Sequence, residues 1–157
     1  MLFQNTVLLN TKKYISTAVF FGNSAYQRLK NLIDSSGPSK LFVLTDRNTR
    51  QLCVKQFLEK LDPKLTPTVL EIPNGEKSKS IEQCSKLWEQ LSHHGADRYS
   101  LLINLGGGVV TDIGGFVAGT FMRGLKFVNV PTSLLAMVDA AVGGKTGIDF
   151  GSLKNQI

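Results

Sequence analysis

Residues 100–115 read SLLINLGGGVVTDIGG, and this stretch decides the fold class. Ser100 to Leu105 is an almost unbroken apolar run, which is typical of a central strand in a parallel sheet covered on both faces. Gly106 to Gly108 follow at once, and a helical stretch then runs from Val109 to Phe121. Such a turn lets backbone N–H groups approach a phosphate at the positive end of a helix dipole. The stretch predicts a phosphate loop on an α/β sheet, although a tight turn without a ligand has the same local pattern.

The rest of the chain alternates between β-prone runs and segments of helical period. The further predicted strands are Tyr14 to Phe21, Lys40 to Thr45, Thr68 to Ile72 and Lys126 to Val130. The further predicted helices run from an N-cap at Ser24 to Gly37, from Thr49 to Lys60, and from an N-cap at Ser80 to His93. This order predicts a Rossmann-like, open, mostly parallel α/β sheet with flanking helices. No linker is evident, so we expect one domain over residues 1–157.

Composition limits the class of protein. The chain has 157 residues, 42% of them apolar and 19% charged, which excludes a disordered tail or a coiled coil. No apolar run reaches the ~18 to 20 residues of a membrane span, and no secretion signal opens the chain, so we expect a cytoplasmic protein. The chain stops on Leu153 to Ile157 without a turn or capping signal, from which we expect a truncated chain.

Charge and metal-ligand types argue against two classes of function. The net charge of +6 has no dense Lys/Arg cluster interleaved with aromatic residues, so nucleic-acid binding is the weaker interpretation and a solvated surface the stronger one. Cys53 and Cys84 lack metal-ligand or disulfide spacing and are expected to be buried thiols. His93 and His94 are adjacent and point to different faces of a helix end, so we expect no metal site.

Two nucleotide-binding fingerprints nearly fit and then fail. The dinucleotide pattern begins at Gly106 and Gly108 but has Thr111 in place of its third glycine. The Walker A pattern ends at Lys145 and Thr146 but has Asp139 in place of its first glycine. Neither an ordinary Rossmann dehydrogenase nor a P-loop NTPase is supported.

Glycines also occur inside the predicted helix that follows the loop. Gly115 and Gly119 lie four residues apart, beside Gly114, and each costs about 1 kcal/mol of helix propensity relative to alanine. We expect Gly115 and Gly119 to let the helix pack closely against the sheet or another helix.

A longer ordered set of motifs resembles one family. After the GGGVVTD loop come FMRG at residues 121–124, VPTSLLAMVDAAVGGKTGID at 130–149 and LKN at 153–155. TDRN at residues 45–48 and PNGEKSK at 73–79 precede the loop in the same order. This string is similar to the 3-dehydroquinate synthase family. Asp149 stands where the family usually has asparagine, which we expect to alter a local hydrogen bond.

The resemblance implies a two-domain enzyme with NAD bound to the N-terminal α/β domain. Zinc or cobalt would be held by a C-terminal helical domain whose ligands are not in this chain, so the fragment alone is expected to be inactive. The family oxidises a ring hydroxyl with NAD, eliminates phosphate, returns the hydride and closes a carbocycle. Its substrate is 3-deoxy-D-arabino-heptulosonate 7-phosphate, which belongs to the shikimate pathway, and the full-length enzyme is expected to be a homodimer.

The resemblance also implies roles for individual residues. Those matching NAD contacts are Asp46, Asn48, Asn74, Gly75, Glu76, Lys77, Ser78, Lys79, Gly107, Gly108, Val109, Val110, Thr111, Asp112, Thr132, Ser133 and Leu135. Those matching substrate-facing positions are Asp139, Lys145, Lys154 and Asn155, of which the first three also match NAD contacts. Arg123 matches an arginine that reaches the substrate from the neighbouring subunit. A surface ion pair of Lys145 and Asp139 is the plainer alternative.

Two other functions stay open at this point. A sister sugar-phosphate cyclase, making an aminocyclitol or valiolone ring, would share the NAD domain and differ mainly in residues further along the chain. A binding module built on a disused NAD domain is another alternative, but such a module would not need Lys145, Lys154, Asp139 and Arg123.

Overall fold

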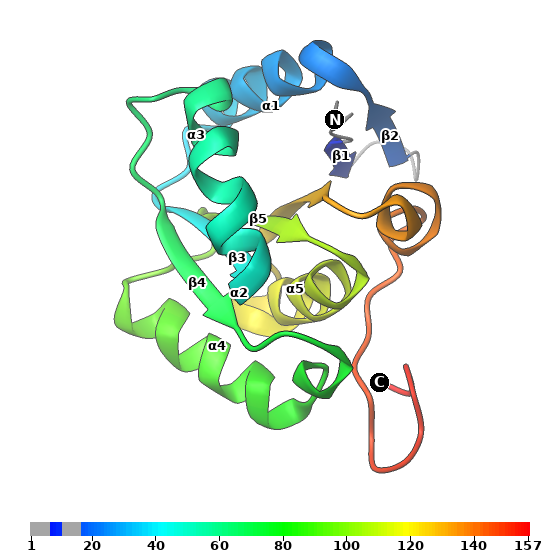
Figure 1. The fold of residues 1–157 in the computed structure, drawn as a ribbon. Coiled ribbons are helices and arrows are strands. Elements are labelled where there is room, and N and C mark those ends of the chain that lie inside the picture. The colour runs from blue at the N-terminus through cyan, green and yellow to red at the C-terminus, as the bar shows by residue number, and fades with distance from the viewer. Residues whose placement is uncertain (1–6, 11–16) are drawn as a thin grey trace.

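The computed structural model describes residues 7–10 and 17–157, and within them the strands form one six-stranded sheet (Figure 1). The strand order is β2-β1-β6-β5-β3-β4. Four strands run parallel: β3 (Leu41–Asp46), β4 (Thr68–Ile72), β5 (Leu101–Gly106) and β6 (Lys126–Pro131). β1 (Val7–Asn10) pairs antiparallel with β6 and with β2 (Thr17–Phe20). The predicted mostly parallel α/β sheet is confirmed.

Helices cover both faces of this sheet (Figure 1). One face carries α4 (Ile81–His93) and α5 (Gly108–Thr120), and the other carries α1 (Gly22–Ser36) and α3 (Lys55–Leu61). A short α2 (Arg47–Thr49) and a π-helical segment (Arg50–Val54) lead directly into α3. No helix in the described residues is long and apolar enough for a membrane span.

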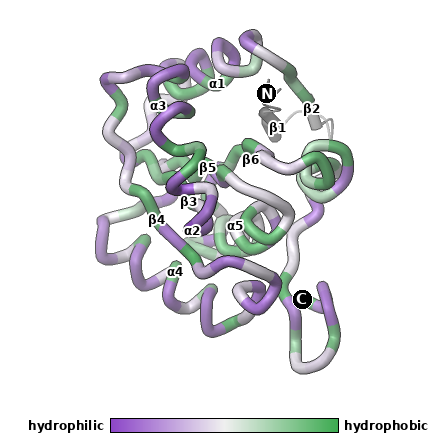
Figure 2. Tube along the Cα trace, in the orientation of Figure 1, coloured by the Kyte–Doolittle hydropathy of each residue, from purple (hydrophilic) through white to green (hydrophobic). Residues whose placement is uncertain are grey.

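The two apolar cores follow from the alternation of side chains along each strand. Phe42 and Leu44 face α4 and α5, whereas Val43 between them faces α1 and α3. All six residues of β5 are buried, as expected of a central strand covered on both sides. Apolar residues accordingly concentrate on the strands, whereas apolar and hydrophilic residues alternate along α4 (Figure 2).

Some predicted boundaries are confirmed and others are wrong. Ser80 caps α4 by accepting a hydrogen bond from the Gln83 N–H, and β4 begins and ends as expected. Ser24 is not an N-cap, because α1 already begins at Gly22, whose φ of 63° suits a residue without a Cβ. The chain is helical from residue 47 onward, not from 49, because Asp46 is the cap.

The antiparallel strands at the sheet edge were only partly predicted. β1 was not expected at all, and the predicted strand from Tyr14 to Phe21 is observed as β2; its residues 14–16 lie outside the described residues. Pairing with β6 and β2, which the local sequence does not encode, defines β1.

Polar and small residues adjoin each other where α5 crosses the sheet. Asn104 of β5 donates a hydrogen bond from Nδ2 to Oδ1 of Asn129, its direct partner on β6, at 2.9 Å. A Cβ on Gly114 would collide with the Asn104 amide. A Cβ on Gly115 would collide with Thr146 and lie in ordinary contact with Phe127, at 3.5 Å, so close packing there is confirmed. A Cβ built on Gly119 would have no described atom within 4 Å. The expected close packing is therefore wrong for Gly119.

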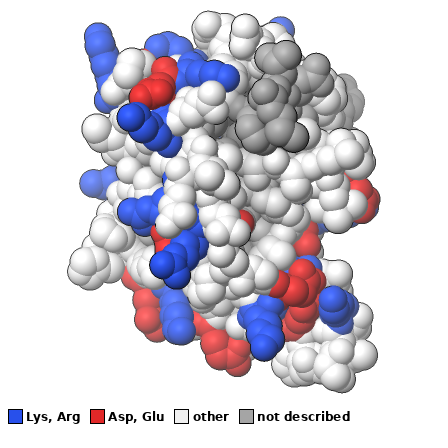
Figure 3. Space-filling view, viewed as in Figure 1, with Lys and Arg blue, Asp and Glu red and all other residues white. Residues whose placement is uncertain are grey.

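Charged side chains form separate groups on the face drawn in Figure 3. Lysines and arginines gather in several places there, with acidic side chains between them along the lower edge. On this face, the positive charge is divided rather than continuous.

Candidate cofactor site at the carboxyl edge of the sheet

Four of the predicted segments meet at one edge of the sheet. Parallel strands end at the same edge, so the residues after β3, β4, β5 and β6 become neighbours there. The connection from β3 leads outward to β4, whereas β5 returns on the other side of β3. Such a reversal of strand order opens a crevice, and ligands of open α/β sheets bind in it.

The glycine loop joins β5 to the N-terminus of α5. Gly107 is the N-cap residue, and its carbonyl accepts a hydrogen bond from the Thr111 N–H at 3.1 Å. A Cβ on Gly108 would lie 3.3 Å from the Cβ of Ala140, so the loop is closely covered there. The first N–H groups of a helix have no partner within it and favour an anion.

Residues of the first turn of α5 differ in what they can offer a ligand. The side chains of Val110 and Thr111 are fully buried, and the Thr111 hydroxyl donates to the Gly108 carbonyl at 3.0 Å. Neither side chain is therefore left for a phosphate, and the Thr111 N–H is also taken, because it donates to the Gly107 carbonyl. Val109 is half-buried and its apolar side chain packs against the core, so its backbone N–H is the polar group that it offers a ligand.

The loop after β6 lies against the glycine loop. Thr132 donates its N–H to the Gly106 carbonyl at 2.9 Å, and the Ser133 hydroxyl accepts from the Ala136 N–H at 3.3 Å. A Cβ on Gly107 would lie 3.5 Å from that hydroxyl. Leu135 is 67% exposed on the short helical turn that follows. Of the predicted contacts, Thr132 and Ser133 thus lie against the glycine loop, and Leu135 follows them in an exposed position.

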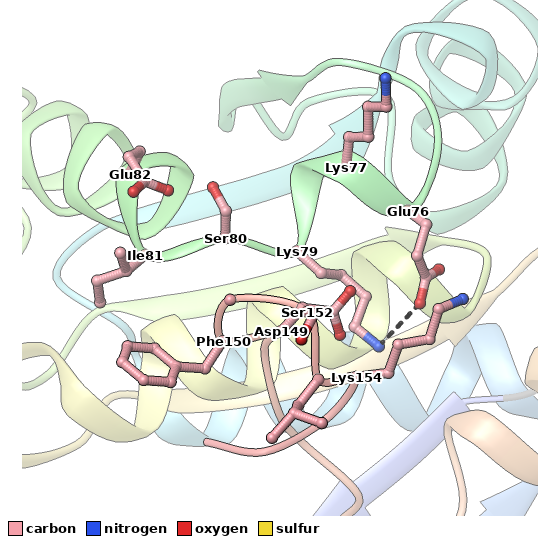
Figure 4. A pocket seen from close by; sticks show the side chains of 12 residues that line it. Glu76, Lys77, Lys79, Ser80, Ile81, Glu82, Asp149, Phe150, Ser152 and Lys154 are labelled. Carbon is pink, nitrogen blue, oxygen red and sulfur yellow. Dashed lines mark hydrogen bonds and ion pairs between the residues drawn. The ribbon is translucent and has the colours of Figure 1, made fainter.

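Lys79 is a buried lysine at the centre of a polar cluster (Figure 4). Its side chain is 3% exposed, and Nζ lies 2.9 Å from Asp112 Oδ2 and 3.5 Å from Glu76 Oε1. Nζ also donates to Oδ1 of Asn155, which comes from the far end of the chain. Three predicted site segments, residues 74–79, the start of α5 and residues 153–155, are joined by this one ammonium group.

Burial and the neighbouring charge shift the pKa values of Lys79 and Asp112 in opposite directions. Burial alone would lower the pKa of Lys79, but the hydrogen bond and charge of Asp112, with Glu76 and Asp149, outweigh it and raise that pKa above its ordinary value. Burial raises the pKa of Asp112, and the hydrogen bond and charge of Lys79 offset only part of that rise. Lys79 is therefore a permanent cation at neutral pH.

The ends of β3 and β4 are joined by their asparagines. Asn74 donates from Nδ2 to Oδ1 of Asn48 at 3.0 Å, and the Asn48 N–H donates to Oδ1 of Asn74 at 3.2 Å. Asp46 caps α2 by accepting the Thr49 N–H at 2.7 Å through Oδ1. Asp46 and Asn48, both predicted NAD contacts, lie at this edge of the sheet and are oriented by these hydrogen bonds.

The segment from Asn74 to Lys79 contributes unequally. Gly75 has a φ of 93°, which favours glycine. The Ser78 hydroxyl is buried and donates to the Pro73 carbonyl at 2.6 Å, so it holds the turn. Lys77 points away from Lys79 and Glu76, into solvent (Figure 4).

Lys145 and Asp139 form an ion pair beside this cluster. They line a hollow of about 410 Å³ together with Asp112, Thr146 and Asn155. Both side chains are more than half exposed, at 59% and 57%. Because both side chains are exposed, their charges are available to a ligand. An exposed ion pair of this kind contributes little to stability.

Lys154 lies on a second hollow, of about 640 Å³, between residues 76–82 and the chain segment 149–154. In Figure 4 its side chain extends towards Glu76, and Phe150 points the other way, towards Ile81. Asp149 ties this segment to the site, because its N–H donates to the Lys79 carbonyl and its Oδ1 accepts the Asn155 N–H, both at 2.9 Å.

Comparison with known proteins identifies the family. A family model described as 3-dehydroquinate synthase N-terminal matches residues 69–157. The chain belongs to the 3-dehydroquinate synthase family. A 3-dehydroquinate synthase of Parabacteroides distasonis is 44% identical over 129 residues, or 82% of this chain and 36% of that protein. One from Pyrococcus abyssi is 46% identical over 134 residues, or 85% of this chain and 40% of that protein. The chain thus spans about two fifths of the length of these relatives.

Solved structures agree on the fold. A 2-deoxy-scyllo-inosose synthase complexed with carbaglucose-6-phosphate, NAD+ and Co2+ superposes with a TM-score of 0.79, at 24% identity, over 97% of this chain and 41% of that one. A 2-epi-5-epi-valiolone synthase of Streptomyces hygroscopicus, with NAD+ and Zn2+ bound, gives 0.71 at 29% identity, over 82% of this chain and 37% of that one.

Arg123 does not lie with the other site residues of this 3-dehydroquinate synthase-family chain. α5 starts at the glycine loop and runs for 13 residues back to the opposite edge of the sheet, about 20 Å at 1.5 Å per residue. There Met122 and Arg123 both have positive φ, 47° and 69°, ahead of Gly124. Arg123 lines neither of the two hollows described above.

The histidines lie at the end of α4, and the cysteines lie in α4 and in the segment from Arg50 to Val54. His93 is the last residue of α4 and His94 its C-cap, which confirms the helix-end assignment. Cys84 is fully buried and Cys53 partly buried. Within residues 7–10 and 17–157, no three His, Cys, Asp or Glu side chains come together as metal ligands.

The sequence alone missed two residues that hold the site together. Asp149 was noted only as a departure from the family pattern, although it bonds to both Lys79 and Asn155. Thr146 was noted only as part of a failed motif, although it packs on α5. These contacts depend on the chain returning to Lys79 for Asp149 and to α5 for Thr146, for which local sequence carries no signal.

Proposed function

We propose that the chain is the NAD-binding part of a 3-dehydroquinate synthase. The observation that carries the proposal is Lys79, a buried cation held near the start of α5 by Asp112 of that helix. The first N–H groups of α5 and the glycine loop suit a pyrophosphate, and the lysine adds a positive charge beside them.

The residues present fit an NAD molecule laid along the carboxyl edge. Asp46 and Asn48 would take the adenosine end, because a carboxylate at the end of the strand beside the glycine loop can accept ribose hydroxyls. Gly107 to Val109 would take the pyrophosphate, and Thr132 to Leu135 would flank it. Lys145 and Asp139 would face the nicotinamide end, where their exposed charges remain available.

For the whole protein we propose the conversion of 3-deoxy-D-arabino-heptulosonate 7-phosphate to 3-dehydroquinate and phosphate. Bound NAD supplies a transient hydride acceptor for a ring hydroxyl. The side chains here would orient the anionic substrate: Lys145, Lys154 and Asn155 offer two ammonium groups and an amide to a carboxylate or phosphate. The identities of 44% and 46% to 3-dehydroquinate synthases favour this substrate over those of the sister cyclases, which are 24% and 29% identical.

The described residues offer no ligand set for zinc or cobalt. We therefore propose that the divalent metal of the reaction is held outside them, and that residues 1–157 alone bind cofactor without turning over. Phosphate release from the sugar phosphate by these residues alone would contradict this.

Titration calorimetry with NAD tests the proposal directly. We expect saturable binding, weakened at least tenfold in Lys145→Met, which removes a charge from the crevice. Lys126→Met is the matched control, because Lys126 is an exposed lysine at the amino end of β6. Absence of NAD binding, together with DNA binding that falls steeply with salt, would replace the proposal with the binding-module alternative.

We further propose a homodimer in the cytoplasm in which Arg123 serves the partner's site. The support is that Arg123 follows the end of α5 away from the glycine loop and lines neither hollow at the site of its own copy. In the full-length enzyme, co-expressing Arg123→Ala with Lys145→Met would restore activity, because mixed dimers contain one site with both residues intact. If neither variant complements the other, the arginine acts within its own copy.

A further inference from the structure

α5 holds the loop that carries Lys145 along one face, at two successive turns. The carbonyl of Asp112 accepts a hydrogen bond from the Gly147 N–H at 3.4 Å. Gly115 lies three residues further along the helix, on the same face. It is buried, and a Cβ there would collide with the methyl carbon of Thr146 and lie 3.1 Å from the Thr146 Cβ. The missing side chain of Gly115 is therefore a notch that receives the Thr146 methyl group.

Lys145 has little of its own among the described residues to fix its position. Its side chain is 59% exposed, and its one ion pair among the described residues is with Asp139, which is equally exposed. An exposed pair fixes a side chain weakly. Immediately after Lys145 the chain becomes anchored, first by the methyl group of Thr146 on the helix and then by buried Gly147 and Ile148.

We propose that Gly115 and Thr146 are positioning residues, which seat the loop of residues 143–147 on α5 and so place the Lys145 ammonium group in the crevice. The anion that Lys145 meets there rests on the proposed function. The seating of the loop on the helix does not.

The same helix supplies a matched control. Gly119 lies one turn beyond Gly115 and has nothing within 4 Å of a built Cβ. Gly119→Ala changes helix propensity in the same way as Gly115→Ala but fills no notch. An effect confined to Gly115→Ala is therefore an effect of the contact.

The test moves one methyl group across the contact. Thr146→Ser removes the methyl group from the loop, Gly115→Ala places one in the notch from the helix side, and the double variant does both. Hydrogen exchange of the amides of residues 143–147 and the affinity for NAD are measured for each. We expect both single variants to exchange about threefold faster or more and to bind NAD correspondingly more weakly, as for residues in direct contact. The double variant should return close to the parent.

The controls are Gly119→Ala and Thr146→Val, which keeps the methyl group, and both should match the parent chain in exchange and affinity. A double variant no better than the worse single variant, or Thr146→Ser indistinguishable from Thr146→Val, would overturn the proposal. If Gly115→Ala does not fold, the serine and valine variants and the double variant still decide it. If the parent chain fails to bind NAD, the proposed function fails, while the exchange measurements still test the seating of the loop.

Discussion

At the scale of single residues, the site depends on side chains that serve the fold and the ligand together. Lys79 joins three chain segments and also places a charge beside the glycine loop. Asp46 caps a helix with one carboxylate oxygen and is the residue that we propose for the adenosine end of NAD. Substitutions at these positions therefore need a design that separates stability from binding.

Lys79→Met should destabilise the chain by about 3 kcal/mol, because it leaves Asp112 partly buried without its cation. Urea unfolding followed by circular dichroism measures the loss. Adding Asp112→Asn should recover part of the stability but not the NAD affinity. If Lys79→Met lowered the free energy of unfolding by well under about 1 kcal/mol, the ion pair of Lys79 and Asp112 would not stabilise the fold as proposed.

Asp46 allows the two roles to be separated by two substitutions. Asp46→Asn keeps a good N-cap, so the unfolding free energy should change little, whereas Asp46→Ala should cost about 1 kcal/mol. Both variants should bind NAD more weakly, since both remove the carboxylate from the crevice. Equal stability of the two variants, measured by urea unfolding, would mean that the Thr49 contact contributes nothing.

At the scale of elements, the connections at the amino edge are tied as firmly as the site at the other edge. The turn between α4 and β5 is held by Asp97, whose Oδ1 accepts from the hydroxyl groups of Ser39 and Ser100 and from the Tyr99 N–H. The Leu101 N–H then donates to the Lys40 carbonyl at 2.9 Å, which brings the starts of β5 and β3 together. These hydrogen bonds connect two turns far apart in sequence.

The turn should make stability depend on pH in the acid range. The hydrogen bond from Ser39, followed by those of Tyr99 and Ser100, lowers the pKa of Asp97. A lowered pKa in the folded state adds stability above the unfolded value of about 3.9, and this stability is lost as the pH falls through the folded value. Asp97→Asn should therefore lose less stability than the parent chain between pH 5 and pH 2.5 in urea unfolding. Parallel pH profiles would contradict this.

The elements also show what sequence can and cannot predict. The strand β4 and the caps of α4 were predicted correctly, because Pro73, Ser80 and the apolar period of α4 are local signals. The strand β1 was missed because its partners are β2 and β6, and pairing across the sheet leaves no local mark. The site motifs were predicted in their order, whereas the contacts of Asp149 and Thr146 required the chain to return to Lys79 and to α5.

At the scale of the whole molecule, a buried thiol reports on global opening. Cys84 is fully buried between α4 and the sheet, and burial raises its pKa to about 11. Both its inaccessibility and its protonation suppress reaction with alkylating reagents.

In a Cys53→Ser variant, the labelling rate of Cys84 by iodoacetamide at pH 8 should follow the global unfolding equilibrium as urea is added. Mass spectrometry of the intact chain measures this rate. The matching Cys84→Ala variant should be labelled faster at low urea, because Cys53 is only partly buried. Rapid labelling of Cys84 without urea would show that α4 detaches locally.

The amide pair of Asn104 and Asn129 bears on how this sheet finds its alignment during folding. The two residues face each other across β5 and β6, in a core that is otherwise apolar. A slip by two positions would keep every side chain on its own face but would place Asn104 opposite Phe127 or Pro131. Each stranded amide would then cost about 1 to 3 kcal/mol, whereas a ladder of valine and leucine alone would tolerate the slip. The pair thus favours the observed register of β5 and β6, the strands that lead into the glycine loop and the turn at Ser133.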